Sequence, residues 1–288
     1  MTAIDPALLD RAARLIDAAD GLLITAGAGM GVDSGLPDFR GPQGFWSAYP
    51  ALGKARIDFQ SIASPRAFEE RPRMAWGFYG HRLALYRATL PHDGFRILLD
   101  WADQMPTGAF VFTSNVDGQF QKAGFKATEI CEVHGSIHHL QCLAGCAGDI
   151  WPATGFEPVV DETRCLLTGP TPTCPHCGGL ARPNILMFSD WGWLEFRERI
   201  QRAAMNRWLE RVERPVVVEL GAGTNIPTAR MAGESLDAPL IRINPAESDV
   251  AHPRDVALPT GALAGLQGID AALLRLAGTI EIDPTDDN

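Results

Sequence analysis

Four short apolar runs, each ending in glycine, asparagine or aspartate, limit most strongly how this chain folds. The runs are "GLLITAGAG" (21–29), "GAFVFTSNVD" (108–117), "PVVVELGAG" (215–223) and "PLIRIN" (239–244). Each is followed by turn residues and then by a helical pattern. Buried strands that alternate with helices are typical of a mostly parallel sheet with helices on both faces. We therefore predict an α/β, Rossmann-like fold that binds its ligands at the carboxyl ends of the strands.

Charge and hydropathy argue against two classes of partner. The 288 residues carry 35 acidic and 25 basic side chains, a formal net charge of −10, with no lysine- and arginine-rich run of the kind that binds nucleic acid. No apolar run reaches membrane-spanning length. The first residues are expected to form a helix with Asp5 as N-cap and Pro6 in its first turn, not a signal peptide. We expect a cytoplasmic protein with no nucleic-acid or membrane partner.

A segment rich in cysteine, glycine, proline and threonine interrupts the pattern between residues 136 and 187. A loop of this length inside a compact domain needs something to hold it together. It contains two cysteine pairs, Cys142 with Cys146 and Cys174 with Cys177. Four thiolates in two such knuckles are typical of a closed tetrahedral Zn²⁺ site, which is structural because no position is left for water.

Two alternatives for these cysteines stay open: reduced thiols in a core, or a redox pair at Cys174 and Cys177. Cys131 and Cys165 have no partner at ligand spacing and are left out of the site. The length suits a main domain with a smaller one attached. The predicted organisation is a discontinuous Rossmann-like domain, 1–135 and 188–288, with a small zinc-binding module, 136–187, inserted in it.

The first strand leads into a glycine-rich turn, "GAGMGVDSGLPDFRG" (27–41). The usual dinucleotide-binding pattern G-x-G-x-x-G fails here, because Val32 stands at the sixth place. A Gly-Ala-Gly turn before a helix still offers N–H groups to a pyrophosphate. From the residues alone, phosphate binding and a simple tight turn both stay open.

The helix "RMAWGFYGHRLALYR" (73–87) places Tyr79, Arg82 and Tyr86 on one face, since they are spaced i, i+3 and i+7. An arginine between two tyrosines is typical of a side chain that reaches from a core edge towards water. The same guanidinium could bind a carboxylate through two hydrogen bonds. Both interpretations stay open at this point.

Several motifs occur in a fixed order from about residue 21 to residue 270. They are Gly27-Ala-Gly29 leading to "SGLPDFRG" (34–41), "TSNVD" (113–117), His134-Gly135, the two cysteine pairs, Arg182-Pro183, the glycine turn 221–224 and Asn244. Together they resemble the sirtuin (silent information regulator) family of NAD-dependent protein deacylases, of bacterial type. The resemblance implies a cleft between the two domains that holds NAD and the acylated lysine of a protein or peptide substrate.

The resemblance also implies individual roles. The residues that would contact NAD are Gly27, Ala28, Gly29, Asp38, Phe39, Arg40, Ser114, Asn115, Asp117, His134, Gly221, Gly223, Thr224 and Asn244. Asn115 and Asp117 would position the nicotinamide ribose and carboxamide, and His134 would be the catalytic general base on a ribose hydroxyl. An imidazole suits that task because its ordinary pKa lies near neutral pH. The alternative for Asn115, Asp117 and Asn244 is strand-end turn chemistry.

Sirtuins that prefer acidic acyl groups carry a Tyr-x-x-Arg pair beside the acyl pocket, and Tyr79 and Arg82 match its spacing. By this resemblance, Ala63 would leave room for the acyl group. Tyr79 would donate a hydrogen bond and Arg82 would pair with the distal carboxylate of succinyl- or malonyl-lysine. The chain would then act as a desuccinylase or demalonylase as well as a deacetylase.

Some positions depart from the family pattern. Ser114 stands in place of the usual glutamine, and Phe188-Ser189-Asp190 stands in place of Phe-Gly-Glu, followed by an unusual "WGW" (191–193). The altered segment favours an alternative, an NAD hydrolase or ADP-ribosyltransferase on the same fold. His134 and the complete cysteine set favour a lysine deacylase that releases nicotinamide and O-acyl-ADP-ribose. A non-catalytic module that senses NAD or ADP-ribose is the third possibility, and the intact polar residues argue against it.

Overall fold

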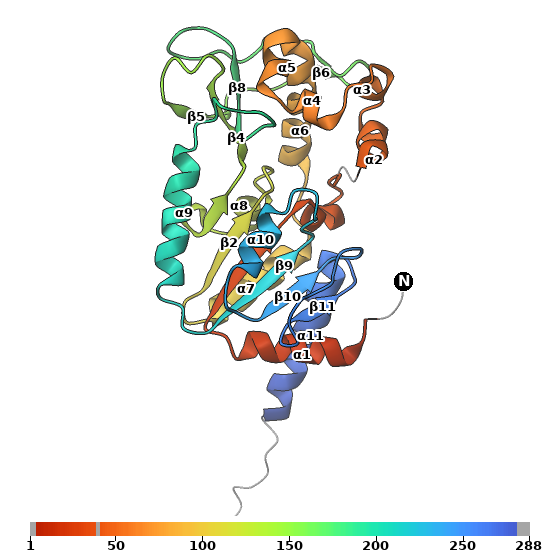
Figure 1. Ribbon diagram of the computed structural model, residues 1–288, viewed down its shortest axis with the longest axis vertical. Coiled ribbons are helices and arrows are strands. Elements are labelled where there is room, and N and C mark those ends of the chain that lie inside the picture. Colours follow the sequence, from red (N-terminus) through yellow and green to blue (C-terminus); the bar gives the residue numbers. More distant parts are fainter. Residues whose placement is uncertain (1–3, 39–40, 281–288) are drawn as a thin grey trace, which may run out of the picture.

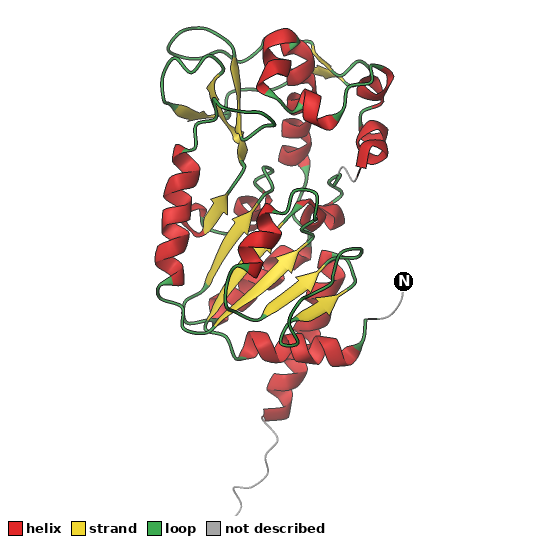
Figure 2. Ribbon diagram, viewed as in Figure 1, coloured by secondary structure: helices red, strands yellow, loops and turns green. Residues whose placement is uncertain are grey.

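A computed structural model of the chain describes residues 4–38 and 41–280. Its main sheet has six strands in the order β11-β10-β9-β1-β2-β3, all parallel (Figures 1 and 2). They are β1 (Gly21–Ala26), β2 (Ala109–Thr113), β3 (Ile130–Glu132), β9 (Pro215–Leu220), β10 (Leu240–Ile243) and β11 (Val256–Leu258). The order is that of a Rossmann sheet, in which strand order reverses between β1 and β9. The predicted α/β fold is confirmed.

Helices cover both faces of this sheet. On one face, Leu22 and Ile24 of β1 belong to a buried cluster with α1, α7 and α11, whereas Leu23 points to the other face and packs with α9. The side chains alternate between the two faces because successive residues of a strand point to opposite sides of the sheet. The helices are α1 (Pro6–Asp17), α7 (Asp93–Gln104), α9 (Phe196–Leu209), α10 (Thr228–Glu234) and α11 (Ala262–Ile280). Shorter helical turns are η1 (Ala28–Ser34), α8 (Gln119–Ala123) and η2 (Ala127–Glu129).

A second unit lies beyond the carboxyl ends of the main-sheet strands, at the top of Figure 1. It contains an antiparallel sheet in the order β5-β4-β8 and a two-stranded ribbon, β6 with β7. Its strands are β4 (Gly135–Cys142), β5 (Ile150–Pro152), β6 (Val160–Asp161), β7 (Leu166–Leu167) and β8 (Ala181–Ile185). Its helices are α2 (Gly41–Ala48), α3 (Pro50–Lys54), α4 (Phe59–Ile62), α5 (Pro65–Glu70) and α6 (Pro72–Ala88).

One buried cluster joins these helices to the strands of the cysteine-rich segment. Phe68 and Trp76 from the helices share it with Ile137, Leu140 and other side chains of the second unit. The Trp76 indole N–H donates to the carbonyl of Ala181 on β8 at 2.9 Å. The second hydrophobic core is therefore built from two separate stretches of chain, and the boundaries predicted at 135 and 188 stay a proposal.

The N-terminal helix begins as predicted. Asp5 is its N-cap, and the carboxylate accepts a hydrogen bond from the Ala7 N–H at 2.9 Å. Pro6 occupies the first helical position, where a missing N–H costs nothing. Among the described helices, none combines the length and the apolar content that crossing a bilayer requires.

Candidate active site and zinc centre

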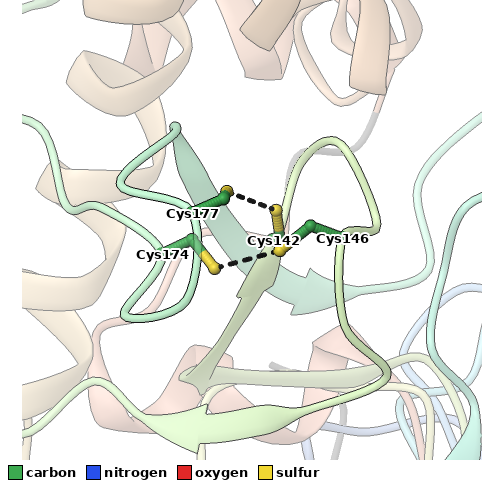
Figure 3. Close-up of side chains that lie close together, drawn as sticks. All are labelled: Cys142, Cys146, Cys174 and Cys177. Carbon is green, nitrogen blue, oxygen red and sulfur yellow. Dashed lines mark hydrogen bonds between the residues drawn. The ribbon is translucent and has the colours of Figure 1, made fainter.

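The four cysteines predicted to bind zinc come together in the second unit (Figure 3). All four Sγ atoms lie within 4.8 Å of one another; Cys142 and Cys177 are 3.8 Å apart, and Cys146 and Cys174 are 3.5 Å apart. With Zn–S bonds of about 2.3 Å, tetrahedral sulfurs would lie about 3.8 Å apart. The donor set therefore fits a structural zinc ion.

Strand pairing explains why the two knuckles meet. Antiparallel β4 and β8 place Cys142 opposite Ala181, and a bridge between Thr173 and Leu180 carries the second knuckle back towards the first. Cys131 and Cys165 are buried thiols that lie outside this group, as predicted.

The glycine turns after β1 and β9 meet backbone to backbone at the switch point of the sheet. The Gly29 N–H donates to the Gly221 carbonyl at 3.0 Å. A Cβ on Gly29 would lie 2.7 Å from Gly221, and one on Gly221, whose φ is +57°, would lie 2.4 Å from Gly29. A Cβ on Gly27 would lie 2.8 Å from the backbone of the same turn. Glycine is therefore required here for close packing, and contact with a pyrophosphate stays a prediction.

The polar residues that follow β2 are fixed against the glycine turn. The Asn115 side-chain amide donates to the Gly27 carbonyl at 2.9 Å, and its backbone N–H is held by the Thr113 hydroxyl at 3.0 Å. The Ser114 N–H continues the ladder by donating to Ala26 at 3.0 Å. The predicted residues at the ends of β1 and β2 therefore lie side by side, as expected for the carboxyl ends of neighbouring parallel strands.

Asp117 is a buried carboxylate at this strand end. One of its oxygens accepts the Gln119 N–H at 2.9 Å. Burial raises the pKa of Asp117 to about 6; the Gln119 hydrogen bond and the Arg82 charge oppose the rise, whereas Glu132 adds to it. The carboxylate is therefore ionised at neutral pH but close to its titration range.

His134 stands where the chain passes from the main sheet into the second unit, between β3 and β4. Its carbonyl accepts the Leu186 N–H at 2.9 Å, and Gly135, with φ +79°, lets the backbone approach Asn184 closely. Burial lowers the pKa of His134, and a hydrogen bond with the backbone of Ser114 acts in the opposite sense. The imidazole is therefore neutral at neutral pH and lies next to the β2 strand end.

The loops after β9 and β10 are tied to one another. Thr224 donates its N–H and hydroxyl to the Glu247 carboxylate, at 3.0 and 2.6 Å. The buried Asn244 side chain donates to Ala222 at 2.9 Å and accepts the N–H groups of Ala246 and Glu247, both at 3.0 Å. Asn244 thus has the turn-stabilising role named as the alternative, and its contact with a ribose stays a prediction.

The remaining predicted NAD-binding residues vary in placement. Ala28 is exposed at the start of η1, and Asp38 and Gly223 are half-buried. The predictions for Phe39 and Arg40 fall outside the residues that the structure describes. Glu247, which accepts the two hydrogen bonds from Thr224, was not predicted from the sequence. A carboxylate three residues after Asn244, close to the end of a strand, was the sequence signal that could have indicated it.

The three predicted acyl-binding residues lie in the second unit, Ala63 directly after α4 and both Tyr79 and Arg82 on α6. Ala63 and Tyr79 are buried, and Arg82 is half-buried on the same face of α6 as Tyr79. Arg82 does not extend towards water: its Nε and Nη2 donate to the Tyr86 hydroxyl at 2.9 and 2.5 Å. Burial raises the pKa of Tyr79, so its hydroxyl stays a donor at neutral pH.

The altered segment after β8 is rigidly anchored. Asp190 accepts two hydrogen bonds from Arg182, at 2.6 and 2.8 Å, and the two side chains are 0% and 1% exposed. Ser189 has φ +54°, the left-handed conformation that favours the glycine expected there. The Phe188 N–H donates to the Ala63 carbonyl at 3.0 Å, whereas the Trp191 side chain is 99% exposed. The altered segment therefore forms a buried ion pair with β8 and presents the Trp191 side chain at the surface.

Comparison with known proteins gives consistent results along most of the chain. Residues 27–217 match the model of the Sir2 family. An NAD-dependent protein deacylase of Aquifex aeolicus is 27% identical over 252 residues, covering 86% of this chain and 93% of that protein. One of Thermococcus kodakarensis is 30% identical over 220 residues, covering 76% of this chain and 75% of that protein.

Solved structures show the same fold. A Sir2 homologue in complex with ADP-ribose superposes with a TM-score of 0.69 at 22% identity, over 93% of this chain and 97% of the other. A relative bound to a myristoylated histone peptide has a TM-score of 0.60 at 20% identity, over 95% and 99% of the two chains. With the family model, the relatives and the geometry in agreement, the chain belongs to the Sir2 family, the sirtuins.

Proposed function

We propose that this chain is an NAD-dependent protein-lysine deacylase that releases nicotinamide and transfers the acyl group to ADP-ribose. One observation carries the proposal: Asn115, the buried Asp117 carboxylate and the neutral His134 imidazole gather at the strand ends beside the Gly29–Gly221 contact. The names of the relatives and the contents of the two solved structures support it.

Each residue has a task in this reaction. NAD, as a substrate, supplies the bond to nicotinamide whose cleavage opens a ribose carbon to the acyl oxygen. The amide of Asn115 and the carboxylate of Asp117 have the donors and acceptors that hold a ribose and a carboxamide. His134, neutral because it is buried, would take the proton of a ribose hydroxyl as general base. Zinc would stabilise the second unit without reacting, since four thiolates close its coordination shell.

The pH dependence of kcat/KM follows from two groups. His134 works as a base when neutral, and its pKa lies below the ordinary 6.5. Asp117 is required as a carboxylate, and its pKa is about 6. Protonation of either group at low pH removes its working form, so kcat/KM is expected to rise with pH and to level off above about pH 7, roughly one unit above the Asp117 pKa. A pH–rate profile with NAD in excess checks this; a limb that levels off only above pH 8 would contradict it.

The acyl preference is proposed from Ala63, Tyr79 and Arg82. They would form a pocket in which the guanidinium and a neutral phenol meet the distal carboxylate of succinyl- or malonyl-lysine. Gln119 contacts both the Tyr86 carbonyl on the Arg82 helix, at 3.1 Å, and the Asp117 carboxylate, at 2.9 Å, which supports a pocket that adjoins the proposed nicotinamide site. In such a buried site, an acyl group without a carboxylate would leave polar groups unpaired.

Arg82→Met is expected to lower kcat/KM for a succinyl-lysine peptide by about 100-fold, because a charge-assisted pair is lost. Turnover of the acetyl-lysine peptide of the same sequence should change by less than about threefold. Arg87→Met, one turn and one residue further along the helix, is the control and should affect neither substrate selectively. Equal losses on both peptides for Arg82→Met would make Arg82 a packing residue.

The function itself is tested by incubating the protein with NAD and a panel of acetyl-, succinyl- and long-chain acyl-lysine peptides. Nicotinamide release should require an acylated peptide. Release at the same rate without a peptide would favour an NAD hydrolase, and transfer of ADP-ribose to the peptide would favour an ADP-ribosyltransferase. We also propose a cytoplasmic location. The division into 1–135, 136–187 and 188–288 is likewise a proposal, in which the helices α2–α6 of the second unit come from within the first segment.

A further inference from the structure

All three tyrosines of the chain gather around Arg82. Tyr49, Tyr79 and Tyr86 are each buried, and each interacts electrostatically with the guanidinium. Their hydroxyls are not equivalent. The Tyr49 hydroxyl bonds to Nδ1 of His81 at 2.9 Å, whereas the Tyr86 oxygen lies within hydrogen-bond distance of two Arg82 nitrogens.

The Tyr86 hydroxyl holds the guanidinium from one turn further along α6. Nε and Nη2 of Arg82 both donate to it, at 2.9 and 2.5 Å, so one phenol oxygen binds one edge of the guanidinium. The guanidinium carbon also lies 5.2 Å from the centroid of the Phe78 ring and 5.3 Å from that of the Tyr86 ring, one helical turn before and one turn after Arg82. A guanidinium held at an edge and between two rings has little freedom to rotate.

Tyr86 is itself anchored to the catalytic side of the molecule. Its carbonyl accepts the Gln119 side-chain amide at 3.1 Å, and the Gln119 backbone N–H binds Asp117. A short series of contacts thus connects Arg82 through Tyr86 to the proposed nicotinamide site. Loss of the Tyr86 hydroxyl would remove both hydrogen bonds that hold the guanidinium in this position.

The Tyr86 hydroxyl also keeps its own O–H, which can donate a hydrogen bond. A phenol has one O–H and accepts hydrogen bonds through its oxygen; Arg82 uses the accepting side. Burial raises the pKa of Tyr86, so the O–H is retained at neutral pH. In the part of the chain that the structure describes, this O–H donates to no acceptor, and both hydrogen bonds of the Tyr86 oxygen are accepted from Arg82.

We propose that Tyr86 is a specificity-determining residue for acidic acyl groups, because its hydroxyl fixes the Arg82 guanidinium in the orientation that receives the distal carboxylate. The inference rests on the proposed deacylase function and on the proposed role of Arg82. It assigns to Tyr86 a positioning role, exerted through Arg82 and not on the reacting atoms.

The test is Tyr86→Phe, which keeps the ring and removes only the hydroxyl. With matched peptides and saturating NAD, kcat/KM for succinyl-lysine is expected to fall about tenfold or more, mainly through KM, since a hydrogen bond to a charged group is lost. The acetyl-lysine value should stay within about twofold. Tyr49→Phe is the matched control: it removes another buried phenol hydroxyl of the same cluster without touching the Arg82 hydrogen bonds, and should leave the succinyl-to-acetyl ratio unchanged.

The outcomes separate the proposals. If the parent protein turns over no acylated peptide, the deacylase function fails. If Arg82→Met leaves the succinyl-to-acetyl ratio unchanged, the acyl-binding role of Arg82 fails. If Arg82→Met lowers that ratio and Tyr86→Phe does not, the inference about Tyr86 is overturned, and an equal loss on both peptides overturns it too. Thermal unfolding of each variant shows whether a loss arises from the fold.

Discussion

Replacement of His134 by alanine is expected to lower kcat for NAD-dependent deacylation by about 10²–10⁴-fold, the usual contribution of a positioned general base. The imidazole lies beside the β2 strand end and is neutral at neutral pH. As a neutral base at this position, it would take the proton of a ribose hydroxyl. The measurement is single-turnover kinetics with an acylated peptide and saturating NAD, so that loss of chemistry is separated from loss of binding.

His139→Ala is the control, because this half-buried histidine of β4 stands five residues further along and has no proposed role. It should keep deacylation within a few-fold of the parent protein. Both variants should unfold at temperatures close to that of the parent. A His134→Ala protein that is folded and retains more than about a tenth of the activity would remove His134 from the catalytic role.

Loss of the zinc site is expected to unfold the second unit. Cys174→Ser removes one of four sulfurs that lie within 4.8 Å of one another. Structural zinc sites contribute about 10–16 kcal/mol in small domains, as much as the whole stability of a typical protein. We expect loss of bound zinc, measured by elemental analysis, together with a fall of many degrees in the unfolding temperature. A strong chelator should have the same effect on the unmodified protein.

Cys131→Ala provides the comparison, since it also removes a buried thiol but lies outside the group of four. It should keep its zinc and lose only about 1 kcal/mol, as a small truncation in a core does. If Cys174→Ser keeps both its zinc content and its unfolding temperature, the four cysteines are not a structural metal site.

Local sequence signals account for much of the fold and of the site. The strands β1, β2, β9 and β10 lie inside the four apolar runs, because strands buried on both faces must be continuously hydrophobic. Since all of them are parallel, the residues at their carboxyl ends had to come together. The cysteine spacing predicted the group of four Sγ atoms for an equally local reason, because thiolates in two short pairs can reach one ion.

Contacts between distant segments could not be predicted from the residues alone. The second unit takes its helices from before β2 and its strands from after β3, so its core depends on tertiary packing. The ion pair of Arg182 with Asp190 needs the chain to turn at Ser189. The spacing of Arg82 and Tyr86 was visible, but only the structure shows that the hydroxyl holds the guanidinium.

The most direct test of the central claim is the identity of the acyl product. The protein is incubated with NAD and an acyl-lysine peptide, and the products are followed by mass spectrometry. We predict O-acyl-ADP-ribose, formed in equal amount with nicotinamide and deacylated peptide. Free ADP-ribose and nicotinamide, produced while the acyl-lysine stays intact, would contradict the account.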